Sequence, residues 1–219
     1  MFAALQLEVE RRLLIVKQTL DTLTRLEADA SHTPEVLRSL KGLTFVQLYA
    51  VYEYCVVTLV QAVIREVNSK GIVVRELRDE LLAFALNDDY KSLADCGWGK
   101  TWAARLHLIN RAKSADPVLV PDNLFPSDGS HFRVDQLRTI WSLFGVTGPC
   151  IPENKFIGRI DEIVELRNGI AHGRMKPEDV GARFSVWDLE VRQADTAVLC
   201  QFLISTVHLH LIAPNAVQK

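Results

Sequence analysis

The sequence is poor in cysteine and has no excess of positive charge, and both shortages exclude classes of protein. Its four cysteines stand far apart among 219 residues, without a Cys-x-x-Cys pair, so no structural zinc site is expected. The formal net charge is -2, which argues against a protein that coats DNA through a broadly basic surface. A local basic cleft is still compatible with that charge.

Familiar catalytic and nucleotide-binding motifs are missing as well. The chain has no Gly-x-Ser-x-Gly and no His-Glu-x-x-His, so hydrolases of those types are not expected. The segment 97–101, Gly-Trp-Gly-Lys-Thr, resembles the end of a phosphate-binding P-loop, but Ala94 stands where that motif needs its first glycine. We therefore predict neither a nucleotide cofactor nor a bound metal.

Apolar residues recur at helical spacing through most of the chain. The pattern predicts helices over about 2–29, 43–69, 74–86, 134–144, 154–172 and 194–211, with a further helix that begins at Thr101. Prolines and glycine between 117 and 130 predict a central loop, and residues 183–192 are compatible with either extended or helical structure. Without a convincing run of strands, the sequence predicts one all-α domain over residues 1–219.

One apolar stretch is long enough to span a bilayer. Between Gly42 and Ile64 the only formal charge is Glu53. A carboxylate at the middle of a bilayer is costly, so we expect a buried core helix, with a membrane anchor as the alternative. Charges from Glu8 onward argue against a signal peptide, and Cys55 fits a reduced, buried thiol. We expect a cytoplasmic protein.

The helix predicted over 154–172 carries an unusual arginine. Arg167 falls in the middle of an apolar face made by Phe156, Ile160, Ile163, Val164, Ile170 and Ala171, with a polar stripe of Asp161, Glu165, Asn168 and His172 along its edge. A charge removed from water is costly unless it is paired. Our hypothesis is that Arg167 faces Glu53. The alternative is that each side chain reaches solvent separately.

His172 stands at the predicted end of that helix, with Gly173 as a stop and Pro177 shortly after. A helix C-terminus favours a charged imidazolium, and histidine titrates near neutral pH. The position therefore suits a residue that takes up and returns a proton. Asn168, four residues earlier, lies on the same side and can orient a phosphate or the imidazole.

The segment 165–173, Glu-Leu-Arg-Asn-Gly-Ile-Ala-His-Gly, resembles the signature of the HEPN superfamily, an arginine and a polar residue with a histidine five positions after the arginine. The helix from Phe45 to Glu53 resembles the Phe…Tyr…Glu helix of stand-alone, HEPN-like bacterial nucleases. The resemblance implies a HEPN-like helical bundle with additional helices. It also implies a metal-independent endoribonuclease that acts on RNA as a homodimer, typically as a toxin or defence effector with a possible antitoxin partner.

The same resemblance implies roles for individual residues. His172 is expected to be the general acid and base, Arg167 to stabilise charge on the phosphate, and Asn168 to orient one of them. Glu53 and Glu165 are expected to support the site. By proximity, Arg174 and Lys176 are candidates for RNA contacts. The alternative function is a non-catalytic module that binds RNA, a nucleotide or a protein, in which His172 only caps its helix.

Aromatic and basic residues alternate in a second segment, which contains Trp98, Lys100, Trp102, Arg105, His107 and Arg111. Such interleaving suits stacking on unpaired bases. We favour the simpler interpretation of an amphipathic helix with Trp102 buried and its charges solvated.

Overall fold

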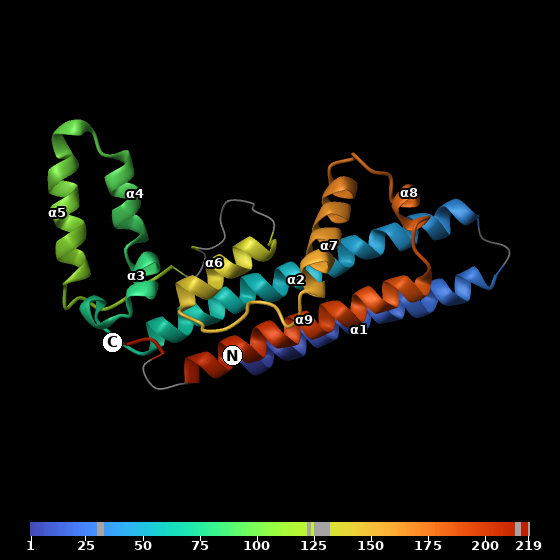
Figure 1. The fold of residues 1–219 in the computed structure, drawn as a ribbon, viewed down its shortest axis with the longest axis horizontal. Coiled ribbons are helices and arrows are strands. Elements are labelled where there is room, and N and C mark those ends of the chain that lie inside the picture. The colour runs from blue at the N-terminus through green and yellow to red at the C-terminus, as the bar shows by residue number, and fades with distance from the viewer. Residues whose placement is uncertain (30–32, 122–123, 125–131, 213–215, 219) are drawn as a thin grey trace. The chain divides into compact units, whose positions relative to one another are not determined.

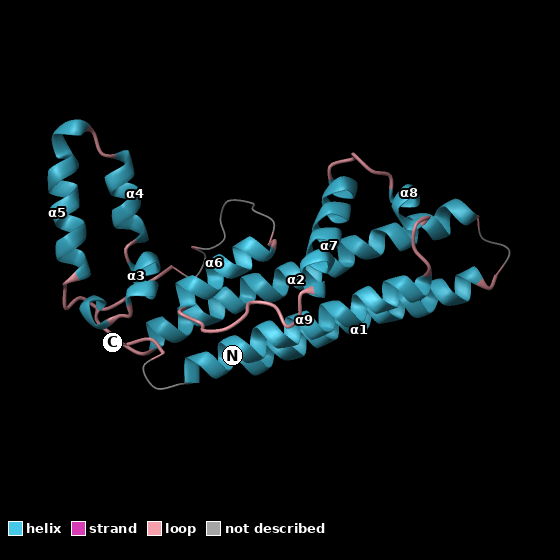
Figure 2. Ribbon diagram, in the orientation of Figure 1, coloured by secondary structure: helices cyan, strands magenta, loops and turns pink. Residues whose placement is uncertain are grey.

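The computed structural model describes residues 1–29, 33–121, 124, 132–212 and 216–218. Within these ranges the regular elements are helices and no strand occurs, which confirms the all-α class (Figures 1 and 2). Of the predicted loop at 117–130, residues 117–121 and 124 are non-helical and the rest lies outside the described residues. The contacts group into two compact units, and each is taken by itself below. The single domain over 1–219 stays a prediction.

The first unit comprises Met1–Leu59, His131–Leu137 and Pro149–Thr206. It contains α1 (Phe2–Glu27), the first part of α2 (Pro34–Ser69), α7 (Lys155–Ala171), α8 (Pro177–Gly181) and most of α9 (Val186–Ile212). α1 and α9 run side by side, and the Gln193 amide donates to the Leu13 carbonyl at 3.4 Å (Figure 1). The core of this first unit includes Leu13, Leu20, Phe45, Leu48, Tyr52, Phe156, Val164, Leu189 and Leu203.

Helix α2 begins at Pro34 and not near residue 43, as the sequence predicted. Proline suits the first turn of a helix because its missing N–H has no partner there. Gly42 lies inside the helix, and a Cβ atom at this position would collide with the Pro177 carbonyl. A Cβ on Gly181 would likewise collide with the Arg38 carbonyl. Gly42 therefore allows α8 to approach the α2 backbone and does not end a helix.

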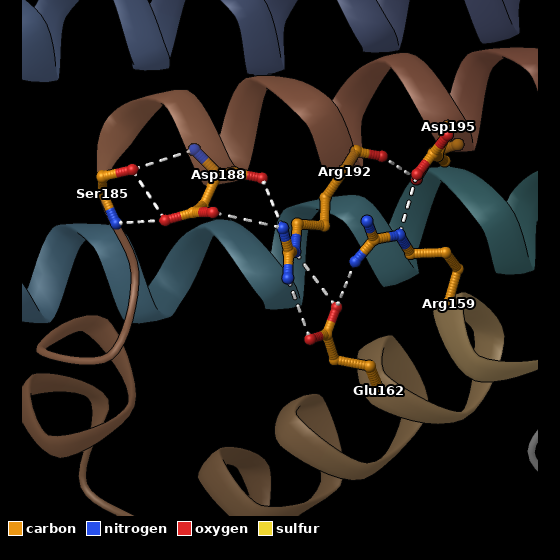
Figure 3. Close-up of polar contacts among 7 residues, drawn as sticks. Arg159, Glu162, Ser185, Asp188, Arg192 and Asp195 are labelled. Carbon is orange, nitrogen blue, oxygen red and sulfur yellow. Dashed lines mark hydrogen bonds and ion pairs between the residues drawn. The ribbon is translucent and has the colours of Figure 1, made fainter. Parts of the chain in front are cut away.

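Arginine and carboxylate side chains connect α7 to α9 (Figure 3). The Arg192 guanidinium donates to both carboxylate oxygens of Glu162 at 3.1 Å. Arg159 donates from Nε to Asp195 at 2.8 Å, and its Nη1 lies 3.4 Å from Glu162. These partly buried, interlinked charges fix the register of α7, the helix that carries the Arg-Asn-x-x-x-His segment, against α9.

The region 183–192, which the sequence left undecided, is helical from Val186. Ser185 and Asp188 cap this helix reciprocally, since the Asp188 N–H donates to the Ser185 hydroxyl at 3.1 Å and the Ser185 N–H donates to the Asp188 carboxylate at 2.9 Å. The pKa of Asp188 is lowered, first by the hydrogen bond from the Ser185 hydroxyl. Figure 3 shows this capping pair beside Arg192.

The second unit comprises Val60–Ser130, Arg138–Gly148 and Val207–Lys219. The helix predicted at 74–86 is interrupted: a 3-10 turn at Val74–Glu76 is followed by α3 (Asp79–Ala85). The Arg78 N–H donates to the Val217 carbonyl at 3.0 Å, so a long-range contact overrides the local helical pattern. α4 (Asn87–Asp95) then begins where the sequence predicted an end, with Asp88 and Asp89 in its first turn, where acidic residues are favourable.

The helix predicted from Thr101 is α5 (Thr101–Ala112), which follows a 3-10 turn at Trp98–Lys100. The predicted burial of Trp102 is wrong, because this side chain is 77% exposed. α5 faces α4 through its small residues: Ala103 and Ala104 line a groove together with Asp89 and Ser92 of α4. α6 (Val134–Phe144) has residues in both units.

Two helices, Pro34–Ser69 and Val186–Ile212, are long and apolar enough to cross a membrane by length and composition alone. In the most apolar window of α2, 56% of the residues are buried inside the structure. The stretch around Glu53 is therefore packed as the core helix that the sequence predicted, with Leu48, Val56 and Leu59 buried.

Candidate active site

The C-terminal end of α7 has the geometry that the sequence predicted. The helix ends at Ala171, and the His172 N–H donates to the Asn168 carbonyl at 3.1 Å. Gly173 follows with φ of +68°, a left-handed conformation that favours glycine, and its N–H donates to the Ile170 carbonyl at 3.0 Å. The His172 side chain is exposed at this helix end.

After Gly173 the chain folds back on the last turn of α7. The Met175 N–H donates to the Gly169 carbonyl at 2.9 Å. A Cβ on Gly169 would lie 2.7 Å from the Met175 sulfur, so glycine leaves room for this return. The fold-back brings Arg174 next to the residues of α7 that precede His172.

The predicted apolar face of α7 is correct for its first three turns only. Phe156, Ile160, Ile163 and Val164 are buried, whereas Ile170 is half-buried and Ala171 is exposed. The reason is the fold-back, which covers Gly169 with Met175 and leaves the outermost residues of the helix end uncovered.

Arg167 is half-buried and held by two neighbours. Its guanidinium carbon lies 4.4 Å from the centroid of the Tyr49 ring, within the range of a cation–π interaction. Its Nη1 donates to the Asn168 side-chain oxygen at 2.8 Å. Asn168 is 6% exposed, and the Tyr49 ring is almost fully buried. Arg167 therefore has a fixed orientation at the edge of the core.

Glu53 does not pair directly with Arg167, contrary to our hypothesis. The Tyr49 hydroxyl donates to the Glu53 carboxylate at 3.1 Å, while the ring of the same tyrosine lies beneath the guanidinium. No ion pair joins Glu53 to Arg167 in the described part of the chain. Tyr49 replaces the direct contact because its ring attracts the cation and its hydroxyl satisfies the carboxylate.

Burial raises the pKa of Tyr49 to about 12, and the adjacent Glu53 carboxylate adds to the shift. The Arg167 cation acts in the opposite direction. The hydroxyl therefore stays protonated near neutral pH and remains a hydrogen-bond donor to Glu53.

A cavity of about 420 Å³ opens beside this cluster. It is lined by Arg133, Glu165, Asn168, Gly169, Arg174 and Met175. Arg133 donates to Asp161 at 2.6 Å and keeps 44% of its side chain exposed. Because Arg133 is paired with Asp161, Arg174 is the cation of this lining that is available to an anionic ligand.

Comparison with known proteins identifies the family. The HEPN_MAE_28990-like HEPN family matches residues 2–211, almost the whole chain. The chain belongs to this HEPN family. No curated protein and no solved structure matches the chain significantly.

The expected HEPN site residues are distributed over the helix end as follows. Arg167 and Asn168 are joined by a hydrogen bond, and Asn168 reaches the cavity together with Glu165 and Arg174. His172 caps the same helix without lining the cavity, and Lys176 is exposed at the start of α8. Glu53 reaches the cluster only through Tyr49.

Two residues that the structure brings to this candidate site, Tyr49 and Arg133, were missed by the sequence interpretation. Tyr49 precedes Glu53 by four residues, the spacing that places two side chains on the same helical face, so a signal for it was present. Arg133 precedes Arg167 by more than thirty residues and gives no local signal. Only the packing of the chain brings it to the cavity.

Proposed function

We propose that this HEPN protein is a metal-independent endoribonuclease whose reaction takes place at the end of α7. The observation that carries the proposal is that Arg167 is oriented by its neighbours while most of its N–H donors remain available. Its guanidinium is oriented by Tyr49 and Asn168, yet one hydrogen bond to Asn168 leaves most of its N–H donors available. An exposed imidazole, His172, caps the same helix.

The chemistry that fits these groups is the transfer of a phosphoryl group from the 5′-oxygen to the 2′-oxygen within the RNA backbone. The 2′-hydroxyl loses its proton to an imidazole and its oxygen forms a bond to the adjacent phosphorus. The bond from phosphorus to the 5′-oxygen breaks, and an imidazolium returns a proton to that oxygen. The products are a 2′,3′-cyclic phosphate and a 5′-hydroxyl, and no electron donor or acceptor is required.

In this proposal His172 exchanges the protons and Arg167 stabilises the negative charge that develops on the phosphate oxygens. Asn168 orients Arg167 through the hydrogen bond between them. Glu53 and Tyr49 act as positioning residues beneath the guanidinium. Glu165 reduces the repulsion between the two arginines of the cavity, where Arg174 contacts RNA phosphate. Lys176 adds a further exposed contact.

One His172 per chain motivates a homodimer as part of the proposal. A single imidazole cannot be both deprotonated base and protonated acid at the same moment, whereas two copies bring two imidazoles to one cleft. We further propose a cytoplasmic toxin or defence effector that a cognate antitoxin protein restrains. If this is right, expression of the wild type slows growth of the host and expression of His172→Ala does not.

A direct test uses purified protein and total RNA in the presence of a metal chelator. We expect cleavage by the wild type and its loss in His172→Ala and Arg167→Ala. His208→Ala is the matched control, because His208 is an exposed histidine of α9 outside the proposed site. Equal cleavage by the wild type and both site variants would refute the nuclease. RNA binding without cleavage by any of them would favour the non-catalytic module.

A further inference from the structure

The surface formed by Trp98, Lys100, Trp102 and Arg105 is the most unusual exposed feature of the second unit. Trp98 is 99% exposed and Trp102 is 77% exposed. Large aromatic side chains in open solvent contribute little to a folded core and commonly mark binding surfaces. We refer to these four residues as the tryptophan face.

Trp102 and Arg105 lie on the side of α5 that points away from α4, whereas Lys100, in the 3-10 turn before α5, lines the groove toward α4 with Asp89 and Ser92. Ala104 and Leu108 on the other side of the helix are half-buried, whereas Arg105 and Leu106 are exposed beside Trp102. The Arg105 guanidinium carbon lies 4.8 Å from the Trp102 ring centroid. The cation and the ring together form one broad, flat surface with positive charge at its edge.

The chain segment that carries the tryptophans has charge of one sign, although Asp89 of α4 lies in the groove with Lys100. From Gly97 to Ala115 the chain contains Lys100, Arg105, His107, Arg111 and Lys113 and not a single aspartate or glutamate. His107 lies 3.2 Å from Asp89, and Arg111 donates to Asp116 at 2.6 Å. Lys100 and Arg105 form no ion pair with any described residue. Lys113 likewise forms no ion pair with a described residue, so two of the three unpaired cations of this segment, Lys100 and Arg105, flank the tryptophans.

We propose that the tryptophan face binds single-stranded RNA by stacking unpaired bases on Trp98 and Trp102. Lys100 and Arg105 would neutralise the phosphates between those bases. Unpaired bases expose their flat faces to aromatic side chains, whereas the bases of a duplex are already stacked on one another. This inference rests on the proposed nuclease activity and specifies its substrate as single-stranded.

The exposed Leu106 and Ile109 would also suit a protein partner. The positive charge of the segment distinguishes an apolar protein partner from RNA. An apolar protein partner gains nothing from an uncompensated cationic segment, because its charges would have to be desolvated. A polyanion is complementary to it and gains from each cation. RNA is therefore the occupant that accounts for both the rings and the charges.

Binding can be measured separately from cleavage in the His172→Ala protein. The probe is a fluorescein-labelled, twelve-nucleotide oligouridine, and the readout is its dissociation constant by fluorescence anisotropy at fixed salt. We expect Trp98→Ala with Trp102→Ala to weaken binding at least about tenfold, since stacking contributes strongly for each base. Lys100→Gln with Arg105→Gln should weaken binding and lower its salt dependence.

Matched controls keep the test specific. Trp187 is also exposed, at 69%, and Trp187→Ala should leave the dissociation constant unchanged. Lys17→Gln with Arg25→Gln removes two exposed charges elsewhere and should have a much smaller effect than the pair at the tryptophan face. A duplex of the same length should bind equally to the protein with and without the tryptophan substitutions.

An unchanged dissociation constant in the Trp98→Ala, Trp102→Ala protein would overturn the inference. Loss of concentration-dependent self-association in that variant, with RNA binding intact, would also overturn it and assign the face to a second copy of the chain. Failure of the nuclease proposal gives a different result, in which the chelator assay shows no effect of His172→Ala while the binding measurement still responds to the tryptophans.

Discussion

At the scale of single residues, the account depends on how one guanidinium is held. Arg167 lies over the Tyr49 ring, donates to Asn168 and has no carboxylate as a direct partner in the described structure. A guanidinium is flat and forked, whereas an ammonium is a compact point charge, so lysine cannot reproduce both contacts. This difference separates a role of Arg167 in orientation from a role as a mere positive charge.

Arg167→Lys should therefore lower the rate of RNA cleavage at least about tenfold, although the charge is kept. Arg174→Lys is the matched control. Arg174 is exposed and makes no ion pair within the described residues, so a lysine there should preserve most of the activity. Initial rates on one labelled RNA measure both variants. If the two substitutions reduce the rate equally, the orientation of Arg167 is not what matters.

His210 provides a prediction on the pH dependence of stability. Its ring Nε2 donates to the Phe144 carbonyl at 3.0 Å, and its pKa is lowered from 6.5, first by burial and further by Arg78, while Phe144 and Glu80 oppose the shift. The unfolded chain therefore takes up a proton at higher pH than the folded chain does. The stabilisation is present above the unfolded pKa and is lost as pH falls through the lower, folded value.

His210→Gln removes this titration and keeps an N–H donor for the Phe144 carbonyl. The decrease in Tm between about pH 8 and about pH 5 should be smaller in His210→Gln than in the wild type. His208→Gln alters an exposed histidine of the same helix and should keep the decrease of the wild type. Thermal unfolding followed by circular dichroism measures all three. Identical decreases in His210→Gln and the wild type would show that His210 does not contribute.

At the scale of helices, the sequence predicted where most elements lie but misjudged several boundaries. Apolar periodicity located α1, α6, α7 and the C-terminal part of α9, because each buries a regular stripe. The start of α9 was detectable in principle from the Ser185 and Asp188 capping pair. The break at Arg78 in the helix predicted over 74–86 was not detectable from the sequence, since the backbone partner of Arg78, Val217, is distant in sequence.

The candidate site likewise contains residues that the sequence indicated and residues that it did not. Arg167, Asn168 and His172 share one helix, so their spacing could be interpreted from sequence alone. The insertion of Tyr49 between Arg167 and Glu53 depends on how two helices pack, and side-chain spacing in one helix carries no information about it. Arg133 reaches the cavity for the same non-local reason.

At the scale of helices, two glycines provide a prediction on the stability of the protein. Gly42→Ala should destabilise the protein by about 1–3 kcal/mol, because the added Cβ meets the Pro177 carbonyl and backbone must move. Gly158→Ala in α7 has no atom within 4 Å of its Cβ and should stabilise the protein by about 0.5–1 kcal/mol. Urea unfolding measures both. A Gly42→Ala protein as stable as the wild type would contradict the close contact of α8 with α2 at Gly42.

At the scale of the whole molecule, the proposed function combines features of both compact units. The first unit contains the helix end with Arg167, Asn168 and His172. The second contains the tryptophan face, whose exposed rings and unpaired cations suit unpaired RNA. Both features suit a polyanionic ligand. The proposed cleavage also requires that the polyanion carry a 2′-hydroxyl.

The most direct test of the central claim is an analysis of product ends on two matched RNAs in the presence of a metal chelator. One oligonucleotide is unmodified, and the other carries 2′-O-methyl groups at its cleavage positions. The account predicts that the wild type cuts only the unmodified RNA, leaves a 2′,3′-cyclic phosphate and a 5′-hydroxyl, and loses this activity in His172→Ala. Cleavage of the 2′-O-methyl RNA, or identical products from His172→Ala, would contradict it.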